Sequence, residues 1–141
     1  MTREFLSHSP AETDELAFSL GRKAEPGDCF ALIGDLGCGK THFSKGFARG
    51  MGINDEITSP TFTPLEEYEG KIPFYHFDLY RIAEESELDS LFFEEYWEGD
   101  GVSLIEWAER AHSRLPAGVV TVRFEYIDAT TRRITLEYPD D

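Results

Sequence analysis

A glycine-bounded loop at residues 34–41, GDLGCGKT, is the feature that most constrains this chain. Its spacing is Gly, four residues, Gly, Lys and Thr, which is the pattern of a phosphate-binding loop. Gly34 and Gly39 let the backbone turn where a side chain would block it, so that successive N–H groups line an anion site. In this pattern Lys40 places a charge near terminal phosphates, and the Thr41 hydroxyl is a ligand for Mg²⁺. The loop therefore predicts a site for a nucleoside triphosphate with Mg²⁺.

The segments beside the loop favour the strand–loop–helix arrangement that such a site needs. DCFALI (28–33) is a short apolar run of strand character. HFSKGFARGM (42–51) places Phe43, Phe47 and Met51 on one helical face. A helix directly after the loop adds its positive N-terminal end to the anion site. The alternative, a glycine-rich turn with no ligand, does not account for this order of elements.

The composition fits one acidic domain spanning residues 1–141. The chain has 141 residues, of which 40% are hydrophobic, and a formal net charge of −15. That charge argues against tight, unaided binding to a nucleic-acid backbone. The longest apolar run, CFALI, is too short to span a bilayer, and MTREFLSHSP lacks the apolar segment of a signal peptide. Cys29 and Cys38 show neither metal-site nor disulfide spacing. We therefore expect a cytoplasmic protein without membrane association.

The remaining pattern predicts the α/β class: a single P-loop NTPase-like domain whose mixed parallel and antiparallel sheet is flanked by helices on both faces. One helix begins at SPAE (9–12), where Ser9 is the cap. Another helical pattern covers residues 85–97. The other expected elements are strands, namely the hairpin of 62–68 with 72–78, a buried strand at 102–107, and the hairpin of 119–126 with 132–138. Alternation places Val120, Val122, Phe124 and Tyr126 on one face.

Two carboxylates follow predicted strands and are candidates for the metal side of the site. VSLIE (102–106) places Glu106 at the end of an apolar strand, in a Walker B-like position. HFD (76–78) places Asp78 at the end of another strand, and His76 faces the same side of that strand. Either carboxylate is suited to hold Mg²⁺ or to orient an attacking water. A single His without a second ligand is more often structural than catalytic.

Three further features border this candidate site. Trp107 follows Glu106 directly, so its ring is expected beside the nucleotide site or on a partner surface, or else simply in the core or at its rim. SPT (59–61) offers hydroxyls that sense a terminal phosphate, as in switch loops, or that cap a helix or strand. No arginine finger is evident; Arg81 is a candidate in cis, and a partner protein is the other source.

The motifs GDLGCGKT, SPTFT, HFDLYR (76–81) and LIEW (104–107), in this order and spacing, resemble the TsaE family. The likeness extends to SPAET (9–13) and ELDSLFFEEYW (87–97), and it covers residues of about 9–115. It implies a small P-loop ATPase of bacterial tRNA threonylcarbamoyladenosine biosynthesis. Such an ATPase works with TsaB and TsaD, which modify adenosine 37 of tRNAs that read codons beginning with A. It does not transfer the threonylcarbamoyl group itself, and its ATP hydrolysis supports turnover of the TsaB–TsaD complex.

The resemblance also implies roles for individual residues, with ATP and Mg²⁺ as cofactors. Thr41 and Glu106 would hold Mg²⁺, and Asp78 would assist the metal or the water. The implied catalytic residues are Lys40, Asp78 and Glu106. The implied nucleotide contacts are Thr13, Leu36, Gly37, Cys38, Gly39, Lys40, Thr41, His42 and Trp107.

Four positions depart from the residues usual in that family: Cys38 stands for Ala, His42 for Thr, Phe92 for Gly and Ala108 for Pro. Cys38 is small enough for the loop. His42 follows Thr41, so we expect intact Mg²⁺ chemistry but a changed contact to the α-phosphate. Phe92 alters a helix turn, and Ala108 loosens the chain after the LIEW motif. None of the four removes a residue assigned to chemistry.

Three other functions share part of this pattern. A small-molecule kinase uses the same loop but needs an acceptor pocket and usually an Arg-rich lid, whereas the basic residues here are scattered. A GTPase usually selects guanine through Asn-Lys-x-Asp, whereas the only asparagine, Asn54, is followed by Asp55. An assembly adaptor would bind nucleotide without hydrolysing it. The acidic charge suits docking to a basic patch on a partner protein, with tRNA contacted only through the complex.

Overall fold

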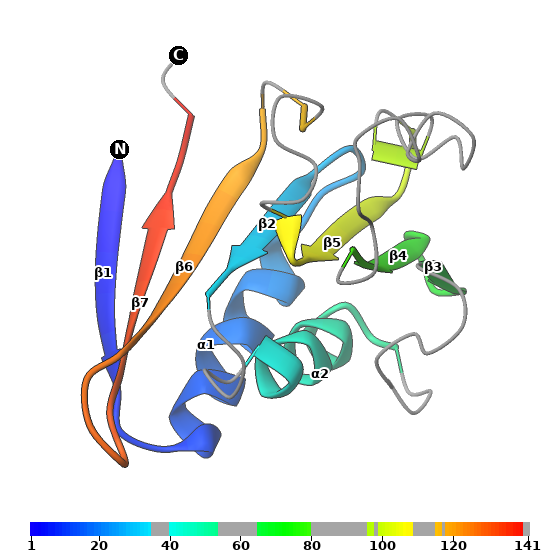
Figure 1. The fold of residues 1–141 in the computed structure, drawn as a ribbon. Coiled ribbons are helices and arrows are strands. Elements are labelled where there is room, and N and C mark those ends of the chain that lie inside the picture. The colour runs from blue at the N-terminus through cyan, green and yellow to red at the C-terminus, as the bar shows by residue number, and fades with distance from the viewer. Residues whose placement is uncertain are drawn as a thin grey trace.

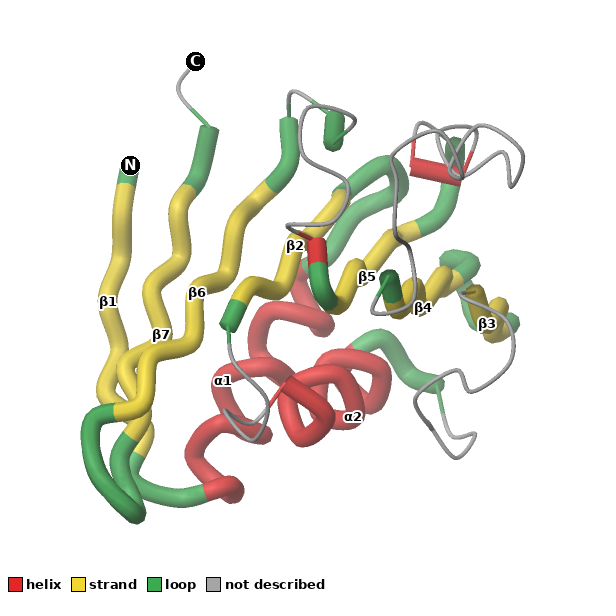
Figure 2. The backbone as a smooth tube through the Cα atoms, in the orientation of Figure 1, coloured by secondary structure: helices red, strands yellow, loops and turns green. Residues whose placement is uncertain are grey.

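A mixed seven-stranded sheet forms the centre of the computed structural model (Figures 1 and 2). The structure describes residues 1–34, 40–53, 65–79, 96–97, 99–108, 115–116 and 118–139. Its strands are β1 (Thr2–Ser7), β2 (Cys29–Ile33), β3 (Leu65–Tyr68), β4 (Phe74–Asp78), β5 (Val102–Glu106), β6 (Val120–Tyr126) and β7 (Arg132–Glu137). They lie in the order β1-β7-β6-β2-β5-β4-β3.

The middle of the sheet is parallel and its two sides are antiparallel. β2 pairs in parallel with both β5 and β6, and β4 pairs in parallel with β5. The carboxyl ends of β2, β4 and β5 therefore meet at one edge of the sheet. Both predicted hairpins are confirmed where they are described: β3 pairs antiparallel with β4, and β6 with β7. β1, which the sequence patterns do not predict, pairs antiparallel with β7.

Two helices, α1 (Pro10–Lys23) and α2 (Lys40–Gly50), lie side by side on the same face of the sheet (Figure 1). The predicted start of α1 is confirmed, because the Ser9 hydroxyl accepts a hydrogen bond from the Glu12 backbone N–H at 3.1 Å. α2 begins two residues earlier than residues 42–51 predict, so Lys40 belongs to its first turn. Within the described ranges, no helix combines the length and the apolar character needed to cross a membrane.

Aromatic packing anchors α2 to the sheet. Phe43 and Phe47 are completely buried, as their spacing predicts. The Phe47 ring meets Phe30 of β2 edge-on with ring centroids 4.9 Å apart, and the Phe43 ring meets Phe124 of β6 at 5.5 Å. Phe74 of β4 lies 5.9 Å from Phe47. Edge-to-face pairs add about 1 kcal/mol each beyond their burial, so α2 has one well-defined seat on the parallel strands.

The opposite face of the sheet is covered differently. Its buried side chains are Cys29, Ala31, Phe77, Leu79, Trp97, Ile105 and Ala108. Trp97 belongs to residues 96–97, the described helical part of the predicted helix 85–97, and its ring meets Phe77 at 5.8 Å. Both described long helices nevertheless lie on one face, so the expectation of helices on both faces rests on residues that are mostly outside the described ones.

The end of β6 departs from the predicted alternation. Val122 and Phe124 are buried, but Tyr126 is 62% exposed although it falls on the same side of the strand. The Tyr126 ring instead contacts the Arg132 guanidinium, which lies 4.6 Å from the ring centroid. Alternation along the strand therefore predicts the face on which Tyr126 lies but not whether that side chain is buried.

Glycines allow α1 and α2 to approach closely. A Cβ atom at Gly21 of α1 would lie 2.1 Å from the Phe47 carbonyl oxygen, and one at Gly50 of α2 would lie 2.2 Å from the Phe18 carbonyl oxygen. Such distances are far inside van der Waals contact, and the opposing atoms are backbone. The two helices therefore pack backbone against backbone, and α1 holds α2 in position from beside it on the same face of the sheet.

Replacing Gly21 by Ala should destabilise the protein. The added methyl group forces α1 away from α2, which we expect to cost about 1–3 kcal/mol of unfolding free energy. Urea unfolding followed by circular dichroism measures this loss. Ser19→Ala, at an exposed position of α1, is the matched control and should leave the midpoint nearly unchanged. Equal midpoints for Gly21→Ala and the wild type would contradict the close helix contact.

Candidate functional site

The described parts of the phosphate-loop motif lie at the carboxyl end of the central strand. β2 ends at Ile33, and α2 begins at Lys40, which confirms the strand and the helix predicted on either side of the loop. In open α/β sheets this edge, next to a strand with parallel neighbours on both sides, is where ligands bind. The loop residues Leu36, Gly37, Cys38 and Gly39 lie outside the described residues.

Lys40 is buried, with 5% of its surface exposed. Its ammonium donates a hydrogen bond to the Gly34 carbonyl oxygen at 2.6 Å, and it lies 3.9 Å from the centroid of the Trp107 ring. No described carboxylate forms an ion pair with it. A buried ammonium held by a carbonyl dipole and an aromatic face is well placed to receive an anion.

Trp107 is held in an unusual backbone conformation. It has a φ of 57°, the left-handed region that a non-glycine residue adopts at a cost of about 1 kcal/mol or more. This turn directly follows the last residue of β5 and lays the half-buried indole ring under the Lys40 ammonium. Strain of this kind is concentrated at functional sites. The structure thus places Trp107 at the site rather than in the core alone.

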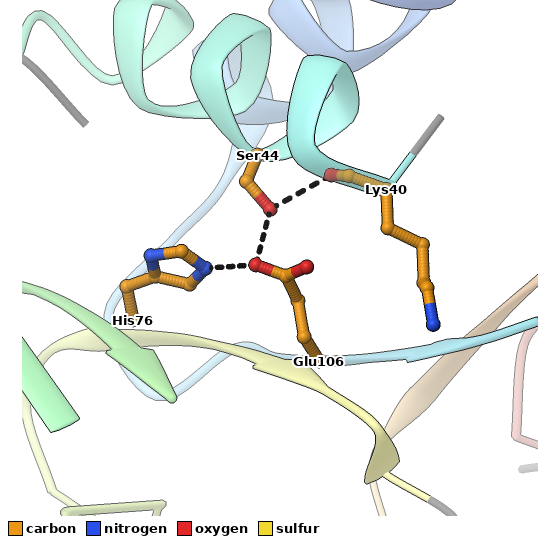
Figure 3. A network of polar contacts seen from close by, with 4 residues as sticks. All are labelled: Lys40, Ser44, His76 and Glu106. Atoms are coloured by element: carbon orange, nitrogen blue, oxygen red, sulfur yellow. Dashed lines mark hydrogen bonds and ion pairs between the residues drawn. The ribbon is translucent and has the colours of Figure 1, made fainter. Parts of the chain in front are cut away.

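Glu106 is the buried carboxylate of the site, with 4% of its surface exposed. Its Oε2 atom lies 2.5 Å from His76 Nε2 and accepts a hydrogen bond from the Ser44 hydroxyl at 3.4 Å (Figure 3). The Ser44 hydroxyl has a single proton, which it shares between Oε2 and the closer Lys40 carbonyl oxygen at 3.0 Å. The network therefore connects β4, β5 and the first turn of α2.

Asp78 lies beside Glu106. The two residues are register partners across the parallel pair β4–β5, so their side chains share the face that α2 covers. Asp78 is half-buried, whereas Glu106 is buried. Strand alternation puts His76 on this face too. The structure thus brings together the two carboxylates between which the sequence left the choice open.

Three other predicted contacts lie elsewhere or are not fully described. The hydroxyl of Thr13, buried in α1, is 2.7 Å from the Ser7 hydroxyl, and no described contact connects it with Lys40. His42 is exposed on α2. Thr41 lies in the same helix, but its side chain is outside the described set. The roles of these three residues stay predictions.

The residues present fit a nucleotide with a divalent cation. Carboxylate oxygens are the ligands that Mg²⁺ prefers, and Glu106 and Asp78 supply two side by side. The start of α2 carries no acidic residue in its first turn, so its positive end adds to the Lys40 charge. Groups suited to a cation and groups suited to an anion thus adjoin at one strand edge, as a metal-bound phosphate would require.

Sequence reasoning missed two contributions to the site. Ser44 follows Lys40 by four residues, which places both on one side of a helix; that spacing is a usable signal. The Gly34 carbonyl is a backbone group, so no residue type in the sequence indicates its role. The glycine itself is required for space, because a Cβ at Gly34 would lie 2.9 Å from the Phe124 carbonyl oxygen. The contact between His76 and Glu106 depends on strand register, which single-strand patterns do not give.

The fold and the site define a single α/β domain in which buried Lys and Glu side chains gather at the carboxyl edge of a mixed sheet. A sequence model of the family described as "Threonylcarbamoyl adenosine biosynthesis protein TsaE" matches residues 7–134. The chain therefore belongs to the TsaE family.

Individual relatives agree. The tRNA threonylcarbamoyladenosine biosynthesis protein TsaE of Bacillus subtilis is 44% identical over 128 residues, which are 90% of this chain and 80% of that protein. The TsaE of Treponema pallidum is 41% identical over 131 residues, 93% of this chain and 97% of that protein. The crystal structure of Bacillus subtilis YdiB superimposes with a TM-score of 0.82 at 37% identity, covering 99% of this chain and 87% of that one.

Cys29 should be inert to alkylation in the folded protein. Burial on the face away from α2, and secondarily the nearby Asp28 charge, raise the pKa of its thiol to about 12 from 9.0. At pH 8 this lowers the reactive thiolate by about 1,000-fold. In Cys38→Ser, Cys29 is the only thiol, because the chain has two cysteines. Mass spectrometry after iodoacetamide treatment should show labelling in urea only; rapid labelling without urea would contradict this burial.

Proposed function

We propose that this chain binds ATP with Mg²⁺ at the edge formed by β2, β5 and β4 and hydrolyses it slowly when alone. We further propose that this hydrolysis supports a TsaB–TsaD complex as it forms threonylcarbamoyladenosine at position 37 of tRNA. The membership in a family of threonylcarbamoyladenosine biosynthesis proteins supports the tRNA pathway. The ATPase activity and the partner proteins are the finer part of the proposal.

One observation carries the nucleotide assignment. Lys40 is buried at the first residue of α2, yet no described carboxylate pairs with it. Burying an ammonium without a counter-ion costs free energy in the unliganded protein. Such an arrangement is expected where a ligand supplies the negative charge. The terminal phosphates of ATP supply that negative charge. The motif around Lys40 has the spacing by which such loops bind phosphates.

The residues divide the chemistry between positioning and charge. Lys40 stabilises negative charge that develops on the transferred phosphoryl group. Glu106 or Asp78 accepts a hydrogen bond from the attacking water and orients it in line. Glu106 and Asp78 would hold Mg²⁺ beside the phosphates, where the cation would supply charge neutralisation. No described arginine serves this site, so we expect low intrinsic turnover that rises in the assembled complex.

The acidic surface suits this role. A net charge of −15 disfavours direct binding to tRNA phosphates, whereas it favours docking to a basic patch on a protein partner. In this proposal the chain contacts tRNA only within the complex. The site needs no acceptor pocket for a second small molecule, since water is the acceptor.

Lys40→Ala should weaken ATP binding, whereas Lys45→Ala should not. Both lysines belong to α2, but Lys45 is exposed and has no part in the site, so the pair separates a phosphate contact from a general loss of charge. Losing a charge-assisted contact to phosphate weakens binding by at least about 10-fold. Isothermal titration calorimetry with ATP and Mg²⁺ measures this. Equal affinities for the two variants would contradict the assignment.

Glu106→Gln should bind ATP but hydrolyse it at least about 100-fold more slowly. The amide keeps an oxygen beside His76, so the fold is retained while the negative charge is lost. Phosphate release and threonylcarbamoyladenosine formation are measured with purified TsaB, TsaD and tRNA, with Glu125→Gln at an exposed position of β6 as control. Modification that continues at full rate with Glu106→Gln would favour a nucleotide-binding adaptor instead.

A further inference from the structure

The two oxygens of Glu106 have different surroundings. Oε2 receives both polar contacts, from His76 at 2.5 Å and from Ser44 at 3.4 Å. In Figure 3 the other oxygen points away from His76, toward the side on which Lys40 lies. One oxygen is thus occupied by the protein, and the other faces the candidate phosphate site. If the terminal torsion of Glu106 were unrestrained, its two oxygens would not keep these separate surroundings.

We propose that His76 is a positioning residue that holds Glu106 in the orientation required for its work. The imidazole Nε2–H donates to Oε2, since an ionised carboxylate only accepts. This contact fixes the plane of the carboxylate and turns its second oxygen toward the side on which Lys40 lies. Ser44, at a longer distance, is a weaker second restraint. The role of Glu106 itself rests on the proposed function.

The burial of His76 favours this role over space filling. Only 1% of His76 is exposed, and its Nδ1 atom has no hydrogen-bond partner among the described residues. An apolar side chain at this position would avoid burying a polar atom without a partner. The imidazole therefore needs a compensating interaction, and the short contact with Glu106 is the one that the structure provides.

His76 is itself held rigidly enough to orient another side chain. It lies in β4, between β3 and β5, where its register partners are Glu66 and Leu104. Its ring is nearly parallel to that of Phe74, with an interplanar angle of 11° and centroids 6.2 Å apart. Partners of metal-binding carboxylates act in this way, and their loss weakens metal affinity or activity by about 10- to 100-fold.

Two substitutions separate positioning from bulk. His76→Phe keeps a planar ring but removes the donor, whereas His76→Gln places an amide N–H near the position of Nε2. Phe77→Leu is the matched control, because Phe77 is equally buried in β4 but faces the other side of the sheet. It should lower the unfolding midpoint without affecting Glu106. Crystal structures of the variants without nucleotide give a first readout that does not depend on ATP.

The second readout is the Mg²⁺ dependence of ATP hydrolysis. For His76→Phe we expect a turned Glu106 carboxylate, a kcat lower by about 10- to 100-fold and a higher Mg²⁺ concentration for half-maximal rate. ADP affinity measured in EDTA should not change. His76→Gln should restore the carboxylate orientation and most of the kcat, and Phe77→Leu should alter neither the kcat nor the Mg²⁺ requirement.

Several results would overturn the positioning role. A Glu106 carboxylate that keeps its orientation in His76→Phe would do so whatever the ATPase activity. An unchanged kcat and Mg²⁺ requirement would do so too, as would equal defects in His76→Gln, His76→Phe and Phe77→Leu, which indicate a structural role only. Failure of the wild type to bind ATP overturns the proposed function instead, and the crystallographic comparison then still tests whether His76 orients Glu106.

Discussion

The packing of α2 against the sheet and against the neighbouring helix α1 fixes the geometry of the whole site. Phe43 and Phe47 pack into the sheet face formed by β2, β4 and β6. Beside α2, Gly21 and Gly50 bring the two helix backbones into direct contact. Lys40 and Ser44 have no freedom to shift independently of this packing, because they belong to the same two turns of helix.

That rigid setting makes an otherwise unfavourable arrangement possible. Lys40, Glu106 and His76 are all almost fully buried, and burying polar groups costs free energy unless each is satisfied. Their partners are partly carbonyl and aromatic groups, such as the Gly34 oxygen and the Trp107 ring. The Trp107 backbone adds strain to this cost. Such a cluster is tolerated where the surrounding apolar packing is strong. Here that packing consists mainly of phenylalanine rings in contact with one another.

The sequence predicts the elements of this fold better than their environments. The spacing of Phe43 and Phe47 predicts the buried face of α2, and the positions of Glu106 and Asp78 at the ends of predicted strands make each a candidate for the metal side of the site. β1 escaped prediction because Thr2–Ser7 has no apolar alternation of its own and is ordered by pairing with β7 from the far end of the chain. Alternation puts Tyr126 on the same face as Phe124, but the structure leaves its side chain exposed.

Contacts between elements were the least accessible to sequence reasoning. His76 and Glu106 are 30 residues apart, and their meeting depends on how β4 aligns with β5. A pattern within one strand gives the face of each side chain but not the residue opposite to it. The contact of the Gly34 carbonyl with Lys40 is equally hard to predict, because a backbone group is present at every residue.

The alignment of β4 with β5 has a consequence for how this chain can change over evolution. Within Phe74–Asp78, inserting or deleting one residue would send His76 and Asp78 through the sheet to the side of Phe77, and Phe77 to theirs. The length of β4 is therefore a tighter constraint than the type of most of its residues. The connection between β6 and β7 is exposed at residues 127–130, and a longer loop there would leave the pairing of β4 with β5 unchanged.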